Sequence, residues 1–181
     1  SKPWGVDGMR IAFLGHGSVL FGWGGQQIYV DPYGKVADYS TLPKADLVLV
    51  THEHADHLDP AALAAIRTDA TALVLTKLAY KQVGAGTVMG NGDSRTVAGL
   101  PIEAVAAYNV VHLRSSGTPF HPKGVGNGYV LTFADTRVYV AGDTENIPEM
   151  KALTDIAVAF LPMNLPYTMT PEMVAEAVRW I

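Results

Sequence analysis

The stretch VTHEHADHLDP, residues Val50–Pro60, contains three of the chain's six histidines and three carboxylates. It follows the apolar run DLVLV, which is typical of a strand buried on both faces. His52 and His54 are two positions apart, so their side chains point the same way only where the backbone is extended. The zincin pattern H-E-x-x-H is absent, because Asp56 stands four positions after His52. The pattern H-x-H-x-D-H at the end of a buried strand therefore indicates a metal-binding loop rather than a solvated turn.

The composition restricts both the partners and the metal chemistry. The net charge is -4 and no run of lysine or arginine occurs, which argues against a nucleic-acid partner. No apolar stretch approaches the roughly 20 residues that a membrane span requires. The chain has no cysteine, so any metal must be bound by histidine and carboxylate. Such ligands suit zinc first, with manganese and iron as alternatives.

The length of 181 residues predicts a single domain over residues 1–181. The chain starts at Ser1 rather than at an initiator methionine, which is compatible with a removed signal peptide or with a cut made for expression. We expect a soluble protein, cytoplasmic or periplasmic after signal removal. The sequence does not indicate an oligomeric state.

The order of the predicted elements indicates two sheets with helices outside. Gly24-Gly25 predicts a hairpin turn, because a primed turn needs positive φ. Asp59-Pro60 predicts a helix start, with an N-cap followed by proline. Strands are expected over 9–14, 18–23, 27–32, 46–50, 71–76, 99–108, 155–162 and in a hairpin over 128–143. Helices are expected over 61–66, 78–83 and 148–153 and after Thr170-Pro171, the last with Met173, Val174, Ala177, Val178 and Ile181 on one face.

Two glycine-containing segments between these elements need separate interpretation. Residues 109–127 are rich in Ser, Gly, Pro and His without periodicity, which predicts a functional or mobile loop. Gly124, Gly126 and Gly128 superficially resemble a phosphate-binding loop. They precede a predicted strand rather than a helix, so no helix N-terminus is available to a phosphate.

The histidine motif resembles the signature of the metallo-β-lactamase fold superfamily. FLGHGSVLF (13–21) and IYVDPY (28–33) resemble the opening strands of its ascorbate-6-phosphate-lactonase-like and N-acylphosphatidylethanolamine phospholipase-D-like branch. FHPKGVGNGYVL (120–131), VYVAGDTE (138–145) and AFLPMNLPYTMT (159–170) continue the pattern. The resemblance implies an α/β fold, the four-layer αββα sandwich.

The resemblance also implies roles for individual residues. His52, His54 and one later histidine would bind a first metal ion. Asp56 and His57 would belong to a second ion, and Asp143 would bridge the two. Asp143 has an ordinary alternative as a turn residue after a strand.

The chain departs from the family pattern at two places. Asn109 stands where the third histidine is expected, and asparagine is a poor zinc ligand. His121 and His112 are the candidates to replace it, and the sequence FHPKG favours His121. The family's last ligand is a histidine on a strand after the final helix seen here, and the chain stops at Ile181. We therefore expect a fold short of its last strand, with one tight metal ion and a second that is weak or absent.

Three further residues have predicted roles near the metal. Asp56 would hold the nucleophile and shuttle its proton. His16, in the sequence GHGS, would contact substrate or polarise a carbonyl, or else be a capped turn histidine. Asp31 would orient a metal-bound histidine through its other ring nitrogen, or else end a strand in a turn.

These residues predict a metal-dependent hydrolase of a small molecule. A metal-bound hydroxide, formed near pH 7, would attack an ester, lactone, amide or phosphodiester. The alternative is a non-catalytic metal- or ligand-binding protein with a degraded site, because of Asn109 and the missing last histidine. A di-iron oxygen reductase of the same fold is less favoured, since that branch has glutamate at the position of His54 and relies on a separate flavin domain.

Overall fold

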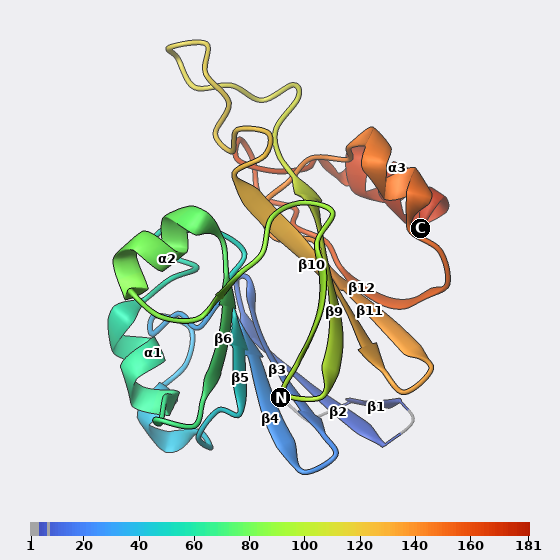
Figure 1. Ribbon diagram of the computed structural model, residues 1–181. Coiled ribbons are helices and arrows are strands. Elements are labelled where there is room, and N and C mark those ends of the chain that lie inside the picture. Colours follow the sequence, from blue (N-terminus) through green and yellow to red (C-terminus); the bar gives the residue numbers. More distant parts are fainter. Residues whose placement is uncertain (1–3, 7) are drawn as a thin grey trace. The chain divides into compact units, whose positions relative to one another are not determined.

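The computed structural model describes residues 4–6 and 8–181, which form two compact units (Figure 1). The first unit comprises the chain up to Met89 together with Thr96–Gly99, and the second comprises Gly90–Arg95 and Leu100–Ile181. Across the described residues there are two sheets and three α-helices, so the predicted α/β class is confirmed. The prediction of a single domain over residues 1–181 stays a prediction.

The first unit is built on a seven-stranded sheet in the order β1-β2-β3-β4-β5-β6-β7. Its strands are β1 (Trp4–Val6), β2 (Met9–Gly15), β3 (Ser18–Trp23), β4 (Gln26–Val30), β5 (Leu47–Leu49), β6 (Ala72–Leu75) and β7 (Thr87–Val88). Strands β1 to β4 pair antiparallel, whereas β4 to β7 pair parallel. The carboxyl ends of β4 and β5 therefore lie next to each other, and the predicted orienting residue Asp31 and the predicted metal-binding loop follow them.

The turn between β3 and β4 is the predicted two-glycine hairpin. Trp23 pairs with Gln26, and the intervening Gly24 and Gly25 have φ of 57° and 83°. Residues with side chains adopt two consecutive positive φ values only at a cost, so glycine suits both positions.

Helices α1 (Pro60–Ile66) and α2 (Lys77–Val83) lie along one face of this sheet (Figure 1). Helix α1 begins as predicted: the Asp59 carboxylate accepts hydrogen bonds from the backbone N–H groups of Ala61 and Ala62. The packed face joins helix and strand side chains in one apolar cluster that includes Tyr29, Val48, Val50, Leu58, Leu63, Ile66, Leu73 and Leu75. This packing holds the loop between β5 and α1 at both of its ends.

The second unit is built on a five-stranded sheet in the order β12-β11-β10-β9-β8. Its strands are β8 (Ser94–Val97), β9 (Leu100–Ala107), β10 (Gly126–Phe133), β11 (Thr136–Val140) and β12 (Ile156–Phe160). Strands β9, β10 and β11 are antiparallel, and β12 joins β11 in parallel. The predicted segment 148–153 forms a short 3-10 helix, Pro148–Ala152.

Helix α3 (Pro171–Trp180) begins where the sequence predicted, with the Thr170 hydroxyl accepting from the Met173 N–H. Met173, Val174, Ala177, Trp180 and Ile181 pack in one cluster with Val130, Tyr139 and Met150. The placement of Val178 on this face was wrong, because its side chain is 56% exposed. Val178 lies about 100° around the helix from the buried Ala177, beyond the edge of the apolar stripe.

The segment between β9 and β10 is the predicted long loop, drawn in yellow in Figure 1. An isolated antiparallel bridge joins Leu113 to Pro119, and the Arg114 N–H donates to the Thr118 carbonyl. Strands β1, β7 and β8 were not predicted, because two of them are only two or three residues long and β8 is mostly exposed. Over the described residues, no helix is long and apolar enough to span a membrane.

Replacing the α3 cap with Thr170→Ala should lower the free energy of unfolding by about 1 kcal/mol, because the Met173 N–H loses its acceptor. The shift in the urea midpoint measures this. Thr170→Ser keeps the hydroxyl and should lose less, and equal losses in the two variants would contradict the capping role.

Candidate metal centre

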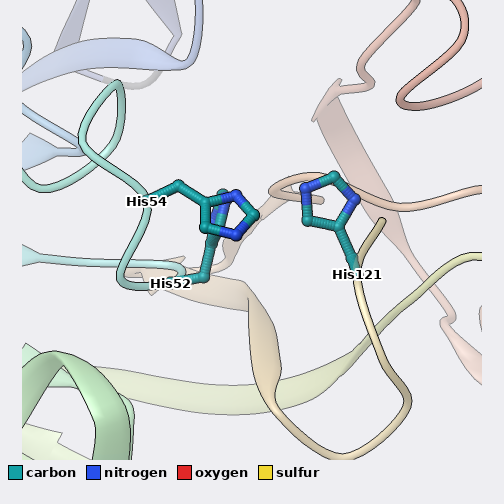
Figure 2. A group of neighbouring side chains, drawn as sticks. All are labelled: His52, His54 and His121. Carbon is teal, nitrogen blue, oxygen red and sulfur yellow. The ribbon is translucent and has the colours of Figure 1, made fainter. Parts of the chain in front are cut away.

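The first set of predicted ligands lies on the loop between β5 and α1. The chain bends at Thr51, Glu53 and His54 after leaving the strand, and the rings of His52 and His54 lie against each other (Figure 2). His52 Nε2 lies 3.1 Å from His54 Nδ1. The chain then turns back, with the N–H of His57 bonded to the carbonyl of His54 at 2.9 Å. One short loop thus brings three imidazoles of the first unit together.

A buried carboxylate at the end of β4 organises these imidazoles. Asp31 is 1% exposed, and its Oδ1 accepts the backbone N–H of Thr51 at 2.7 Å. Its Oδ2 accepts the Thr51 hydroxyl at 2.6 Å and lies 2.7 Å from His57 Nδ1. The structure therefore places Asp31 against His57, in the orienting position that the sequence predicted.

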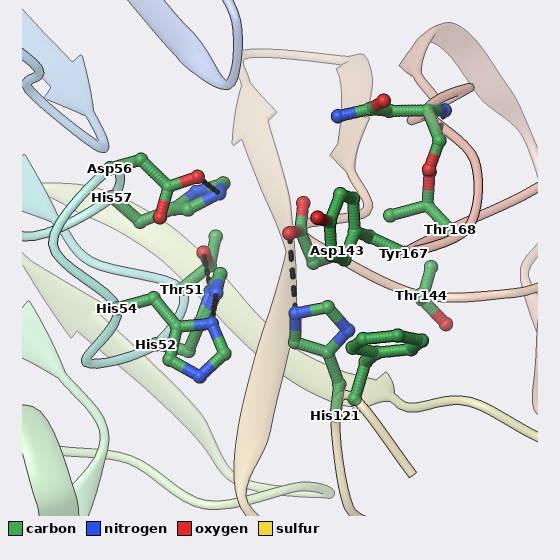
Figure 3. A network of polar contacts seen from close by, with 12 residues as sticks. Thr51, His52, His54, Asp56, His57, His121, Asp143, Thr144, Tyr167 and Thr168 are labelled. Atoms are coloured by element: carbon green, nitrogen blue, oxygen red, sulfur yellow. Dashed lines mark hydrogen bonds and ion pairs between the residues drawn. The ribbon is translucent and has the colours of Figure 1, made fainter. Parts of the chain in front are cut away.

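These contacts determine which ring nitrogen carries the proton. A carboxylate only accepts, so His57 must donate from Nδ1 to Asp31. The Thr51 hydroxyl gives its proton to Asp31, so its oxygen accepts from His52 Nδ1, 2.9 Å away (Figure 3). In both rings the neutral tautomer then carries a lone pair on Nε2, the nitrogen turned away from Asp31.

The two residues predicted to be catalytic contact each other in the same unit. His16 Nε2 lies 2.9 Å from Asp56 Oδ2, and the same carboxylate oxygen is 3.8 Å from His57 Nε2. One ligand atom from each of these three residues falls within 4.8 Å of the others. His16 has a positive φ of 53°, which aims its ring toward this group at the end of β2. The following Gly17 has no side chain because a Cβ there would lie 2.9 Å from the His57 ring.

The second unit contributes a histidine and a carboxylate that converge. His121, on the loop before β10, is buried, and Asp143 follows β11. His121 Nε2 lies 3.3 Å from Asp143 Oδ2, as the dashed line in Figure 3 shows. On the other side of the ring, His121 Nδ1 lies 2.8 Å from the side-chain oxygen of Asn109. That oxygen only accepts, so the neutral ring again has its lone pair on Nε2, facing a carboxylate oxygen.

Two electron-pair acceptors at this distance repel each other unless a cation or a proton lies between them. The chemistry of the donor set therefore fits a metal ion at His121 and Asp143, with neutral imidazole nitrogen and carboxylate oxygen as ligands. In the first unit, ligand atoms of His16, Asp56 and His57 also lie within 4.8 Å of one another, but a neutral His16 ring can donate to Asp56 without a cation.

The two candidates for the third histidine have different surroundings. His121 faces Asp143, whereas His112 places its Nδ1 2.7 Å from Glu145 Oε1. Asn109, at the position where the family pattern has histidine, contacts the ring of His121 with its side-chain oxygen. In the second unit, Asn109 thus orients a candidate ligand.

The comparisons with known proteins now bear on this geometry. A family model described as "Beta-lactamase superfamily domain" matches residues 10–181. A UPF0173 metal-dependent hydrolase of Methanoculleus marisnigri is 35% identical over 176 residues, which cover 96% of this chain and 76% of the relative. The chain belongs to the UPF0173 metal-dependent hydrolases. A second member, from Methanopyrus kandleri, is 34% identical over 184 residues, which cover 96% of this chain and 80% of that relative.

Solved structures agree with this family. A crystal structure from Parabacteroides distasonis, described as a candidate metal-dependent hydrolase, is 48% identical, with a TM-score of 0.91 and coverage of 95% of this chain and 77% of that one. Igni18, a metallo hydrolase from Ignicoccus hospitalis, is 25% identical, with a TM-score of 0.76 and coverage of 95% and 78%. The α/β fold with its two sheets matches these neighbours, and the chain is a metal-dependent hydrolase of the beta-lactamase superfamily.

A buried glutamate of this hydrolase was missed by sequence reasoning. Glu145 is 1% exposed, and its carboxylate accepts the backbone N–H groups of Val110, Val111 and His112 at 2.6 to 2.7 Å. Burial alone would raise the pKa of Glu145, but these three N–H groups and the Asn109 amide lower it below its ordinary value. The ionised side chain thus holds the start of the loop after β9.

Thr51 was also missed by sequence reasoning, although both Thr51 and Glu145 lie next to residues of a predicted site motif. Thr51 directly precedes the histidine motif, and Glu145 ends the sequence AGDTE that contains Asp143. Threonine is not a usual zinc ligand, and in AGDTE it is Asp143, not Glu145, that matches the family motif. Both residues act through the histidines that they hydrogen-bond or through the backbone that positions them.

Replacing the shared acceptor with Asp31→Asn should weaken zinc binding by about 10–100-fold, because one amide group would face donors from Thr51 and His57. Competition with a chromophoric chelator measures the affinity. Asp69→Asn, at an exposed position, is the control and should leave affinity unchanged. Unchanged affinity in a folded Asp31→Asn protein would refute the orienting role.

Proposed function

We propose that His52, His54 and His121 bind one tight divalent metal ion, that Asp56 and His57 belong to a second, weaker site, and that Asp143 bridges the two ions. The observation that carries this proposal is the convergence of His121 Nε2 on Asp143 at 3.3 Å, with the proton of the ring committed to Asn109. The family resemblance supplies the assignment of residues from both units to one centre.

Zinc is the metal we propose, with manganese and iron as alternatives. Neutral imidazoles and carboxylates, without thiolates, suit all three ions. Three of the proposed ligands, His52, His57 and His121, already donate the N–H of Nδ1 to an oxygen acceptor. Metal-binding histidines usually make such a hydrogen bond with the ring nitrogen that does not bind the ion. These partners reduce the reorganisation that metal binding requires.

The chemistry follows from what the ion and the side chains supply. A bound divalent ion lowers the pKa of water to about 7 and polarises a carbonyl or phosphoryl oxygen. Asp56, whose side chain is 43% exposed, orients the attacking water and accepts its proton. His16 holds the Asp56 Oδ2 atom at 2.9 Å, which leaves the Oδ1 atom for the water. We propose that His16 also contacts the substrate carbonyl, as the family resemblance implies.

We propose hydrolysis of an ester, lactone, amide or phosphodiester in a small molecule. The resemblance to the lactonase-like and phospholipase-D-like branch favours a lactone or a phosphodiester among these. The net charge of -4 disfavours a polyanionic nucleic-acid substrate. The non-catalytic alternative is less favoured, because Asn109, one of the two reasons for it, hydrogen-bonds the proposed ligand His121.

Removing metal with a chelator should abolish hydrolysis, and adding zinc or manganese should restore it. A panel of chromogenic esters, lactones, amides and phosphodiesters identifies the reaction class, and elemental analysis gives the metal content. Metal binding without turnover on any class would favour the binding protein. Full turnover in metal-free protein would refute the proposed mechanism.

His121→Ala should weaken zinc binding by more than about 100-fold, a larger loss than orienting residues give, because a direct ligand is removed. His112→Ala is the matched comparison and should have a much smaller effect, since its ring faces Glu145. Metal titration of both apoproteins checks this. A larger loss in His112→Ala would assign the third ligand to His112 instead.

A further inference from the structure

Asn109 uses both the oxygen and the nitrogen of its side-chain amide in hydrogen bonds. It is 4% exposed and lies two residues after the end of β9. Its side-chain oxygen accepts the backbone N–H of His121 at 2.8 Å and lies 2.8 Å from His121 Nδ1. Its side-chain nitrogen donates to the Tyr167 carbonyl at 2.9 Å and to Glu145 Oε1 at 3.3 Å.

Two backbone groups determine which way the Asn109 amide points. The N–H of His121 can only donate, so the atom facing it is the amide oxygen. The carbonyl of Tyr167 can only accept, so the atom facing it is the amide nitrogen. The oxygen beside His121 Nδ1 is therefore an acceptor, and the ring must donate to it.

The backbone reinforces this arrangement. The Asn109 N–H donates to the His121 carbonyl at 2.9 Å, so the two residues are bonded through main chain and side chain. Glu145 holds the next three N–H groups, which prevents the chain after Asn109 from turning away. The position and tilt of the imidazole are thus set from one side of the ring.

We propose that Asn109 is a positioning residue that selects the Nδ1-protonated tautomer of His121 and aims its Nε2 at the metal. This rests on the proposed function in taking His121 as a ligand. An asparagine meets the requirement because one amide accepts from His121 while donating to Tyr167 and Glu145. An aspartate would accept equally well, but it would set a second carboxylate against Glu145 and lose both donated bonds.

The first test is made on the metal-free protein by long-range ¹H–¹⁵N NMR at a pH where the rings are neutral. The parent protein should show His121 as the Nδ1-protonated tautomer, and Asn109→Ala should lose this preference. The predominance of the Nε2-protonated form in the parent would overturn the proposal, whether or not the protein binds metal.

The second test measures zinc affinity of the apoproteins by competition with a chromophoric chelator. Asn109→Ala should bind about 10–100-fold more weakly, and Asn109→Asp should show a smaller loss. Asn146→Ala is the matched control, because it removes an asparagine that donates to Glu176 instead. Unchanged affinity together with an unchanged tautomer in folded Asn109→Ala would overturn the proposal.

The remaining outcomes are also decisive. A parent protein that binds neither zinc, manganese nor iron overturns the proposed function, while its tautomer still decides the role of Asn109. If Asn109→Ala does not fold, Asn109→Asp takes its place. A folded Asn109→Asp protein with full parental affinity would then overturn the requirement for an amide.

Discussion

Donation of a ring proton to a buried acceptor is the interaction on which the candidate site depends. His57 donates to Asp31, His52 to the Thr51 hydroxyl, and His121 to Asn109. A neutral imidazole has one donor and one acceptor nitrogen, so committing the proton to Nδ1 leaves Nε2 as the electron-pair donor. A metal site needs that nitrogen free of protons and aimed in a defined direction.

The strands explain how the acceptors reach these rings. Asp31 follows β4 and Thr51 follows β5, which are neighbours in a parallel sheet, and the Asp31 N–H extends the ladder to Leu49 at 3.0 Å. The two residues are adjacent because the carboxyl ends of parallel strands meet at one edge. In the second unit, Asn109 follows β9 and His121 precedes β10, and a backbone hydrogen bond joins the two residues beyond the paired part of these strands.

The departure at Asn109 has a physical explanation. The proposed centre needs a metal ligand and a residue that orients it, and in the second unit the hydrogen-bonded pair His121 and Asn109 can supply both. Histidine at position 109 would supply a ligand but not an acceptor fixed by two backbone groups. The loop length between Asn109 and His121 is tolerated because Glu145 and the Leu113–Pro119 bridge order that segment.

Local signals in the sequence determined the ligand loop, the Asp59 and Thr170 helix caps, the Gly24-Gly25 hairpin and the metal-binding family. Each depends on residues within a few positions, whose spacing reports strand or helix geometry directly. Only the tertiary structure decided the acceptors of the histidines. Asp31 is separated from His57 by 26 residues and Asn109 from His121 by 12, and such pairs are set by tertiary packing and buried hydrogen bonding. Periodicity carries no information about register, so the sequence predicted candidate ligands and one orienting residue, Asp31, but neither Thr51 nor Asn109 as an acceptor.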